Sequence, residues 1–297
     1  MSERIVHKVC PLCGSTAIRE YNNVRDWSVS QEQFFIFQCD DCSLRFTREV
    51  PDEKSISNYY QSEQYISHTD TQKGLIAHLY HWVRKYTLQQ KVRRVKKETG
   101  KSFGRHLDIG AGTGAFVNAM EKAGWSAEGV EPSDAARAKA HELYRASVYP
   151  MRELEIFPEK SFNAITLWHV LEHVHNLHGI MATIKKLLDQ EGVLFIAVPN
   201  YLSVDASYYK KDWAAYDVPR HLYHFCPDSM QRLMQLHGMK IKRLVPMWFD
   251  SFYVSMLSEK YKKGSLFRAL PVALWSNIVA LFNRKRSSSL IYVIEQQ

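Results

Sequence analysis

Two pairs of cysteines near the start of the chain have the spacing of metal ligands. The pairs are Cys10 with Cys13 and Cys39 with Cys42, and each leaves two residues between its cysteines. This gap lets both thiolates of one turn face the same point, and two such turns complete a tetrahedral sulfur shell for Zn²⁺. Four thiolates leave no open position, so the spacing predicts a structural zinc in a ribbon module over residues 1–50. A redox-active or incidental role for the cysteines is the alternative, and two paired motifs in one short segment favour zinc over it.

A glycine-rich turn lies between an expected strand and an expected helix in the middle of the chain. Residues 105–109 alternate as a short strand, Gly110, Gly112 and Gly114 follow, and residues 115–123 have the pattern of a helix. Strand, glycine turn and helix in this order form the first unit of a nucleotide-binding α/β sheet. Glycines tolerate positive φ and let a ligand press against bare backbone. The sequence therefore predicts a nucleotide-like cofactor at this turn.

An acidic residue ends the next expected strand. Residues 127–130 form this strand and lead into Glu131, after which Pro132 stops the strand and Ser133 can cap a helix over 134–144. A carboxylate at the tip of the second strand can accept hydrogen bonds from both ribose hydroxyls of an adenosine. The glycine turn and the acid together are a more specific signal than the turn alone.

The segments LDIGAGTG and VEPS resemble motifs one and two of class I S-adenosylmethionine-dependent methyltransferases. The resemblance implies an α/β fold over 101–297 with a Rossmann-like, seven-stranded sheet, in which strands at 240–246 and 287–295 form a final antiparallel pair beside strand five. It also implies S-adenosylmethionine as the cofactor, with Glu131 on the ribose and Met151 near the adenine. The residues expected to bind the cofactor are Asp108, Gly110, Ala111, Gly112, Gly114, Glu131, Pro132, Met151, Trp168 and His169.

Further polar residues follow the expected fourth strand, 161–170. The run WHVLEHV resembles a subgroup of the same family in which a histidine and a glutamate follow strand four, and we expect a helix to open at 171–174. Open α/β sheets bind ligands at the carboxyl ends of their strands, so Glu172 and His173 are expected near the cofactor. The pattern His169-x-x-Glu172-His173 also matches an inverted zinc-protease motif, but that motif needs both histidines on one helix.

Two more histidines stand in an unusual stretch, 217–225, that resembles the substrate-side insertion of this subgroup. His221 and His224, together with His173, are candidate general bases, because an imidazole can take up a proton near neutral pH. The alternative for each of the two is a structural histidine that is bonded to backbone.

Two helical segments frame these motifs. Residues 75–98, in a connector over 51–100, have an apolar face and a basic face that includes Lys91. We expect the basic face to be solvated, with nucleic-acid contact as the minority interpretation. Residues 266–282 are apolar and are interpreted as core or as a lid over a bulky substrate, with an interfacial membrane helix as the alternative. Polar interruptions and short length make this segment a poor transmembrane span.

The composition narrows the choice of partner only slightly. The chain has 39 basic and 31 acidic residues and a net charge of +8, which favours anionic partners. Without a secretory signal, and with cysteines suited to a reducing compartment, a cytoplasmic location is expected. The resemblance implies methyl transfer to a small-molecule or glycan-type acceptor, such as a nucleotide-linked sugar. Methylation of ribosomal RNA bases and a non-catalytic binding protein with this fold remain as alternatives.

Overall fold

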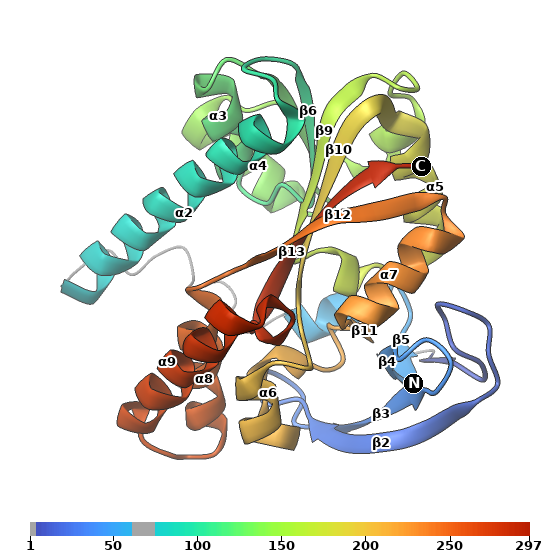
Figure 1. Ribbon diagram of the computed structural model, residues 1–297, viewed down its shortest axis with the longest axis vertical. Helices are drawn as coiled ribbons and strands as arrows, with labels where there is room; N and C mark the ends of the chain where they lie inside the picture. Colours follow the sequence, from blue (N-terminus) through green and yellow to red (C-terminus); the bar gives the residue numbers. More distant parts are fainter. Residues whose placement is uncertain (1–3, 61–74) are drawn as a thin grey trace.

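A parallel-rich sheet forms the centre of the molecule in the computed structural model, which describes residues 4–60 and 75–297, with backbone alone for 75–81 (Figure 1). The sheet has seven strands in the order β12-β13-β10-β9-β6-β7-β8. Strand β13 runs antiparallel to both of its neighbours, and the remaining pairs are parallel. The strands are β6 (Arg105–Ile109), β7 (Ser126–Val130), β8 (Val148–Tyr149), β9 (Phe162–Trp168), β10 (Leu188–Pro199), β12 (Met239–Pro246) and β13 (Ser289–Gln296). This arrangement confirms the predicted fold class, including the antiparallel insertion beside strand five.

Both faces of the sheet are covered, as its apolar strands require. In β10, Val193 and Phe195 face the layer of α2 (Leu75–Thr99) and α3 (Ala115–Lys122). Leu194 and Ile196 face the opposite layer, which contains α5 (Leu177–Leu187) and α7 (Pro227–Leu236). Helix α4 (Asp134–Tyr144) lies against β8 at the edge of the sheet. The period of two in the strand therefore places alternate side chains in two separate cores.

Two predicted boundaries in this region are wrong. The residues after β9 do not open a helix: they form a single 3-10 turn, η3 (Leu171–His173), and α5 begins only after Asn176, whose side chain accepts a hydrogen bond from the Gly179 amide. Strand β10 begins at Leu188 rather than at Val193. The turn-like residues between them belong to the strand, where they shift the register of its pairing with β9. Because η3 is a single turn, His173 stays close to the carboxyl end of β9.

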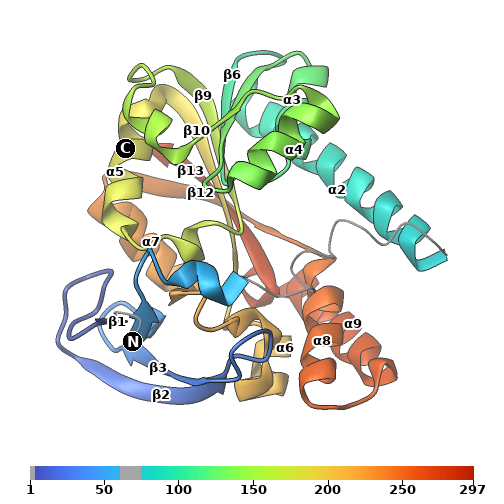
Figure 2. The ribbon, with the colours of Figure 1, turned by 180° about the vertical axis from the view of Figure 1, so that it is seen from behind.

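The cysteine-bearing segment forms a small sheet at one end of the molecule (Figure 2). Its strands β2 (Ile18–Arg25), β3 (Gln33–Cys39) and β4 (Arg45–Thr47) are antiparallel, and β1 (Arg4–Val6) pairs separately with β5 (Glu49–Pro51). The fourth strand, β11 (Tyr223–His224), comes from the distant insertion and pairs with β4. The ribbon sheet is thus completed by the segment that also carries His221.

The insertion and the end of the chain add three helices. They are α6 (Val204–Tyr209), α8 (Asp250–Tyr261) and α9 (Leu266–Phe282), and α9 packs against the other two. The described residues contain no helix long and apolar enough to cross a membrane. Residues 61–74 of the expected connector over 51–100 lie outside the described residues.

Candidate active site

The four cysteine sulfurs converge on one point. Sγ of Cys10 lies 3.5 Å from Sγ of Cys42, and Sγ of Cys13 lies 3.6 Å from that of Cys39. All four sulfurs are within 4.8 Å of one another. A tetrahedral Zn²⁺ with Zn–S bonds of about 2.3 Å requires sulfur separations of about 3.8 Å, so this cluster is compatible with zinc. The site lies in the ribbon and is shielded by buried apolar side chains.

The glycine turn has the open backbone that a bound ligand requires. Gly110, Gly112 and Gly114 have φ of 75°, 53° and 73°, a region that favours glycine. A Cβ on Gly110 would lie 2.4 Å from Val170, and one on Gly114 would lie 2.9 Å from Ala140. A Cβ on Gly112 would meet nothing within 4 Å. The outer two glycines therefore permit close packing, while the middle one faces open space where a ligand can lie.

Glu131 is held against this turn. Its Oε2 accepts a hydrogen bond of 3.0 Å from the Gly112 amide, and its Oε1 accepts one of 3.1 Å from the Ser133 amide. Pro132 follows on the exposed side of the strand end, and Met151 begins the short turn after β8, packed against the core. The carboxylate thus stands beside the open glycine, as binding of a ribose requires.

Asp108 is buried beneath the turn. Its Oδ1 accepts a hydrogen bond of 2.5 Å from Thr166, whose hydroxyl oxygen lies 2.9 Å from Nε2 of His106. Burial raises the pKa of Asp108 to about 7, although Thr166 and the Lys91 ammonium act in the opposite direction. A carboxyl with such a pKa is partly protonated at neutral pH, so it can donate or accept a hydrogen bond at the floor of the site.

His169 links the end of β9 to the start of α8. It has φ of 57°, its Nδ1 lies 3.4 Å from Oε1 of Glu172, and its Nε2 lies 3.1 Å from Oδ2 of Asp250. Burial would lower the pKa of this imidazole, but the two carboxylates outweigh it and raise the pKa to about 10. His169 is therefore a cation at neutral pH, held between the two carboxylates.

Glu172, His173 and His221 form a compact group beside His169. One ligating atom of each lies within 4.8 Å of the others, and the two imidazole rings meet edge to face at 4.6 Å. Nδ1 of His173 is 3.0 Å from the Arg220 carbonyl, and Nδ1 of His221 is 2.9 Å from the Ala215 carbonyl. The Ala215 carbonyl can only accept, so Nδ1 of His221 donates to it and Nε2 is left as the acceptor of a neutral ring, whereas Nδ1 of His173 also lies 3.0 Å from the Tyr60 hydroxyl.

The electrostatics of this group favour neutral imidazole beside a charged carboxylate. Burial, with a smaller contribution from His221, lowers the pKa of His173 to about 4. Burial would raise the pKa of the fully buried Glu172, but His169, His221 and His173 together lower it. The neutral imidazole of His173, the ring of His221 and the Glu172 carboxylate can serve as proton acceptors or as ligands for a divalent cation.

His224 lies outside this group, and Trp168 lies at the strand end beside it. His224 is buried in β11, with Nε2 3.4 Å from the Thr47 hydroxyl and its ring edge to face with Tyr216. Burial holds the pKa of His224 well below its usual value. Trp168 is half-buried at the end of β9, with its ring 5.4 Å from that of Phe116. The structure thus brings His173 and His221 together and places His224 in the ribbon sheet.

Lys85, Arg93 and Lys97 of the expected solvated face are exposed, but Lys91 is half-buried, so the prediction is wrong for Lys91. Its Nζ lies 4.2 Å from the centre of the Trp168 ring. Burial lowers the pKa of this amine, while Asp108 and Asp250 act to raise it. The spacing of Leu88, Lys91 and Val95 on one helix face, with Val95 buried, is the signal that could have placed Lys91 inward.

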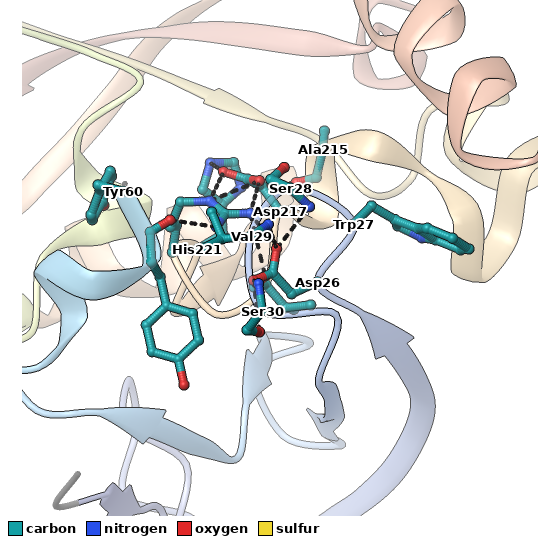
Figure 3. A network of polar contacts seen from close by, with 12 residues as sticks. Asp26, Trp27, Ser28, Val29, Ser30, Tyr60, Ala215, Asp217 and His221 are labelled. Carbon is teal, nitrogen blue, oxygen red and sulfur yellow. Dashed lines mark hydrogen bonds and ion pairs between the residues drawn. The ribbon is translucent and has the colours of Figure 1, made fainter. Parts of the chain in front are cut away.

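A buried ion network behind His221 was also missed (Figure 3). Arg220, which is 1% exposed, donates to Asp217 at 2.7 Å, to Asp26 at 3.0 Å and to the Tyr59 carbonyl at 2.8 Å. Asp26 also accepts hydrogen bonds from the backbone of the ribbon loop, including the Ser30 amide at 2.8 Å. The ribbon therefore fixes the loop that presents His221.

Comparison with known proteins agrees with this geometry. A family described as "Methyltransferase domain" matches residues 80–244. The ubiquinone biosynthesis O-methyltransferase of Actinobacillus pleuropneumoniae serotype 7 is 28% identical over 194 residues, covering 55% of this chain and 83% of the relative. That of Glaesserella parasuis is 33% identical over 118 residues, covering 36% of this chain and 50% of the relative.

A solved structure shares the fold. Magnesium protoporphyrin IX methyltransferase from Synechocystis superposes with a TM-score of 0.54 at 13% identity, covering 83% of this chain and 100% of that one. Sheet order, glycine turn and strand-end acid define a class I, Rossmann-like methyltransferase. The chain belongs to the S-adenosylmethionine-dependent methyltransferase family.

Proposed function

We propose that S-adenosylmethionine lies along the glycine turn, with its ribose hydroxyls on Glu131 and its amino-acid end over Asp108. The observation that carries this is the open space at Gly112 beside the Glu131 carboxylate. The Gly112 amide donates a hydrogen bond to Glu131. A ribose hydroxyl placed beside this amide would donate to the same carboxylate. Ala111, Pro132, Met151 and Trp168 complete the expected lining.

We further propose that the acceptor is a hydroxyl of a small molecule or glycan. Two observations support this: the O-methyltransferase names of the relatives, and the proton-accepting group of Glu172, His173 and His221. Bound S-adenosylmethionine supplies a methyl group that is already strongly electrophilic, so the protein contributes mainly alignment and proton removal.

In this mechanism His221 is the general base. Its Nδ1 proton is held by the Ala215 carbonyl, so Nε2 is directed to accept a proton from the acceptor hydroxyl. The buried carboxylate of Glu172 stabilises the imidazolium that forms. His173, held by the Arg220 carbonyl, lines the same space and orients the hydroxyl. His224 keeps a structural role in the ribbon sheet.

The cysteine cluster is proposed to bind a structural zinc. Its sulfur separations and its closed shell fit Zn²⁺, and the ribbon it would stabilise carries Asp26, which holds Arg220. In this way the metal would act on the site only through the position of the 217–221 loop.

Transfer of a labelled methyl group tests the proposed function. The protein is incubated with methyl-labelled S-adenosylmethionine and separate pools of catechols, nucleotide-linked sugars and transcribed RNA. Incorporation into an alkali-stable methyl ether of a small hydroxyl acceptor is expected. Label that appears only in RNA, or on nitrogen or carbon of a small molecule, would contradict the proposed acceptor.

A further inference from the structure

Helix α9 carries its large apolar side chains on the outside. Its outer face, which we define as Phe267, Leu270, Trp275, Ile278, Leu281 and Phe282, is exposed throughout. Phe267 is 91% exposed and Phe282 is 89% exposed. The interpretation of this segment as core is therefore wrong for its large residues. An exposed apolar face of this extent marks a surface that contacts something apolar.

The orientation of α9 is fixed by its small residues. Ala269, Ala273, Ser276 and Ala280 are buried at helical spacing, on the side that packs against α6 and α8. The Ser276 hydroxyl donates a hydrogen bond of 2.8 Å to the buried carboxylate of Asp205. The small side chains allow close approach of the helices, so turning α9 to hide the outer face would break this packing.

The surroundings of the outer face are strongly cationic. Exposed basic residues stand at both ends of α9, and they are Lys260, Lys262, Lys263, Arg268, Arg284 and Lys285. The sequence has no acidic residue between Glu259 and Glu295. An apolar helix face with basic residues around it suits a bilayer that contains anionic lipid, because acyl chains take the apolar groups and headgroups pair with the cations.

A groove continues this surface at the turn between α8 and α9. Its volume is about 440 Å³, and apolar parts of Tyr253, Met256, Leu257 and Leu266 line it together with Lys260 and Lys263. The apolar floor of the groove can contact an acyl chain, and the two lysines can pair with an anionic headgroup of the same lipid.

We propose that the α8–α9 hairpin lies on the surface of a membrane that contains anionic lipid, with the outer face of α9 among the acyl chains. A second copy of the chain is a poorer partner, because a symmetric contact would bring the same cations against each other. The hairpin contacts the ribbon loop at the end of α8, where Tyr261 stacks on Trp27 with ring centres 5.7 Å apart, so the proposal concerns the outer face of α9 and the groove beside it. This inference does not rest on methyl transfer.

Flotation with vesicles tests the inference on the whole chain without cofactor or acceptor. Vesicles of phosphatidylcholine with about a third phosphatidylglycerol should bind the protein, neutral vesicles should bind it at least about 10-fold less, and added salt should weaken the binding. The variant F267S/W275S/F282S, altered only at exposed positions, should lose binding by about 10-fold or more. K262E/K263E should lose the preference for anionic vesicles.

The matched control is F103S/I156S, which removes apolar residues that are 75% and 72% exposed elsewhere on the surface. This control should bind as the unaltered chain does. Equal binding to neutral and anionic vesicles, or unchanged binding of F267S/W275S/F282S, would overturn the proposal. Sedimentation that shows a dimer which the same variant converts to a monomer would overturn it in favour of a self-interface.

Discussion

Replacement of His221 by glutamine is expected to lower kcat by about 10²- to 10⁴-fold, the usual contribution of a general base. Glutamine keeps a polar side chain of similar reach but cannot take up the acceptor proton. The affinity for S-adenosylmethionine should change little, because His221 belongs to the insertion rather than to the glycine turn. Steady-state kinetics and calorimetry on the same preparation separate the two effects.

A matched control distinguishes base catalysis from a general loss of structure. His178 provides the control: it is exposed, lies 3.0 Å from His237 on the surface, and its replacement by glutamine should leave kcat unchanged. An H221Q enzyme with normal kcat would refute the base assignment. Activity that vanishes on chelation and returns with a divalent cation would reassign Glu172, His173 and His221 to a metal.

The D26A variant is expected to lose about 1–3 kcal/mol of unfolding free energy, the cost of leaving buried hydrogen-bonding groups unsatisfied, because Arg220 keeps Asp217 as its ionic partner. The side chains of Asp26 and Arg220 are 0% and 1% exposed, so water cannot replace the lost contact. Backbone amides of the ribbon loop lose their acceptor at the same time. Urea denaturation followed by fluorescence measures the change.

The control for this prediction is an exposed ion pair. Glu159 and Lys186 lie 3.3 Å apart with side chains 63% and 52% exposed, and E159A should cost no more than about 1 kcal/mol. Because the Arg220 carbonyl holds His173, D26A should also lower kcat under conditions where it remains folded. If D26A and E159A proved equally stable, the ribbon would not be anchored through Arg220.

The predictions that the structure confirms came from patterns of residues that are close together in the sequence. The glycine turn, the second strand and the strand-end acid occupy one continuous stretch, so spacing alone orders them from β6 to Glu131. The cysteine pairs likewise define their own turns, although not the contribution of β11 to the ribbon sheet. In both cases the chemistry follows from residues close together in the chain.

Contacts between distant segments could not be predicted in this way. Arg220 reaches Asp26 across 194 residues, and His169, which follows β9, reaches Asp250 at the start of α8, with no periodic pattern to link them. In α9 the hydropathy showed an apolar segment but not which side would pack. The small residues at 269, 273, 276 and 280 follow helical spacing, and they would have given that answer.

Calorimetric titration with S-adenosylmethionine tests the central claim most directly, using the unaltered chain, E131Q and the control E128Q, which alters a neighbouring acid on β7. The unaltered chain and E128Q should bind one equivalent with similar affinity. E131Q should bind about 10- to 100-fold more weakly, because hydrogen bonds to a charged group are each worth about 1.5–3 kcal/mol. No binding to the unaltered chain, or equal affinity for all three, would contradict a cofactor held at Gly112 and Glu131.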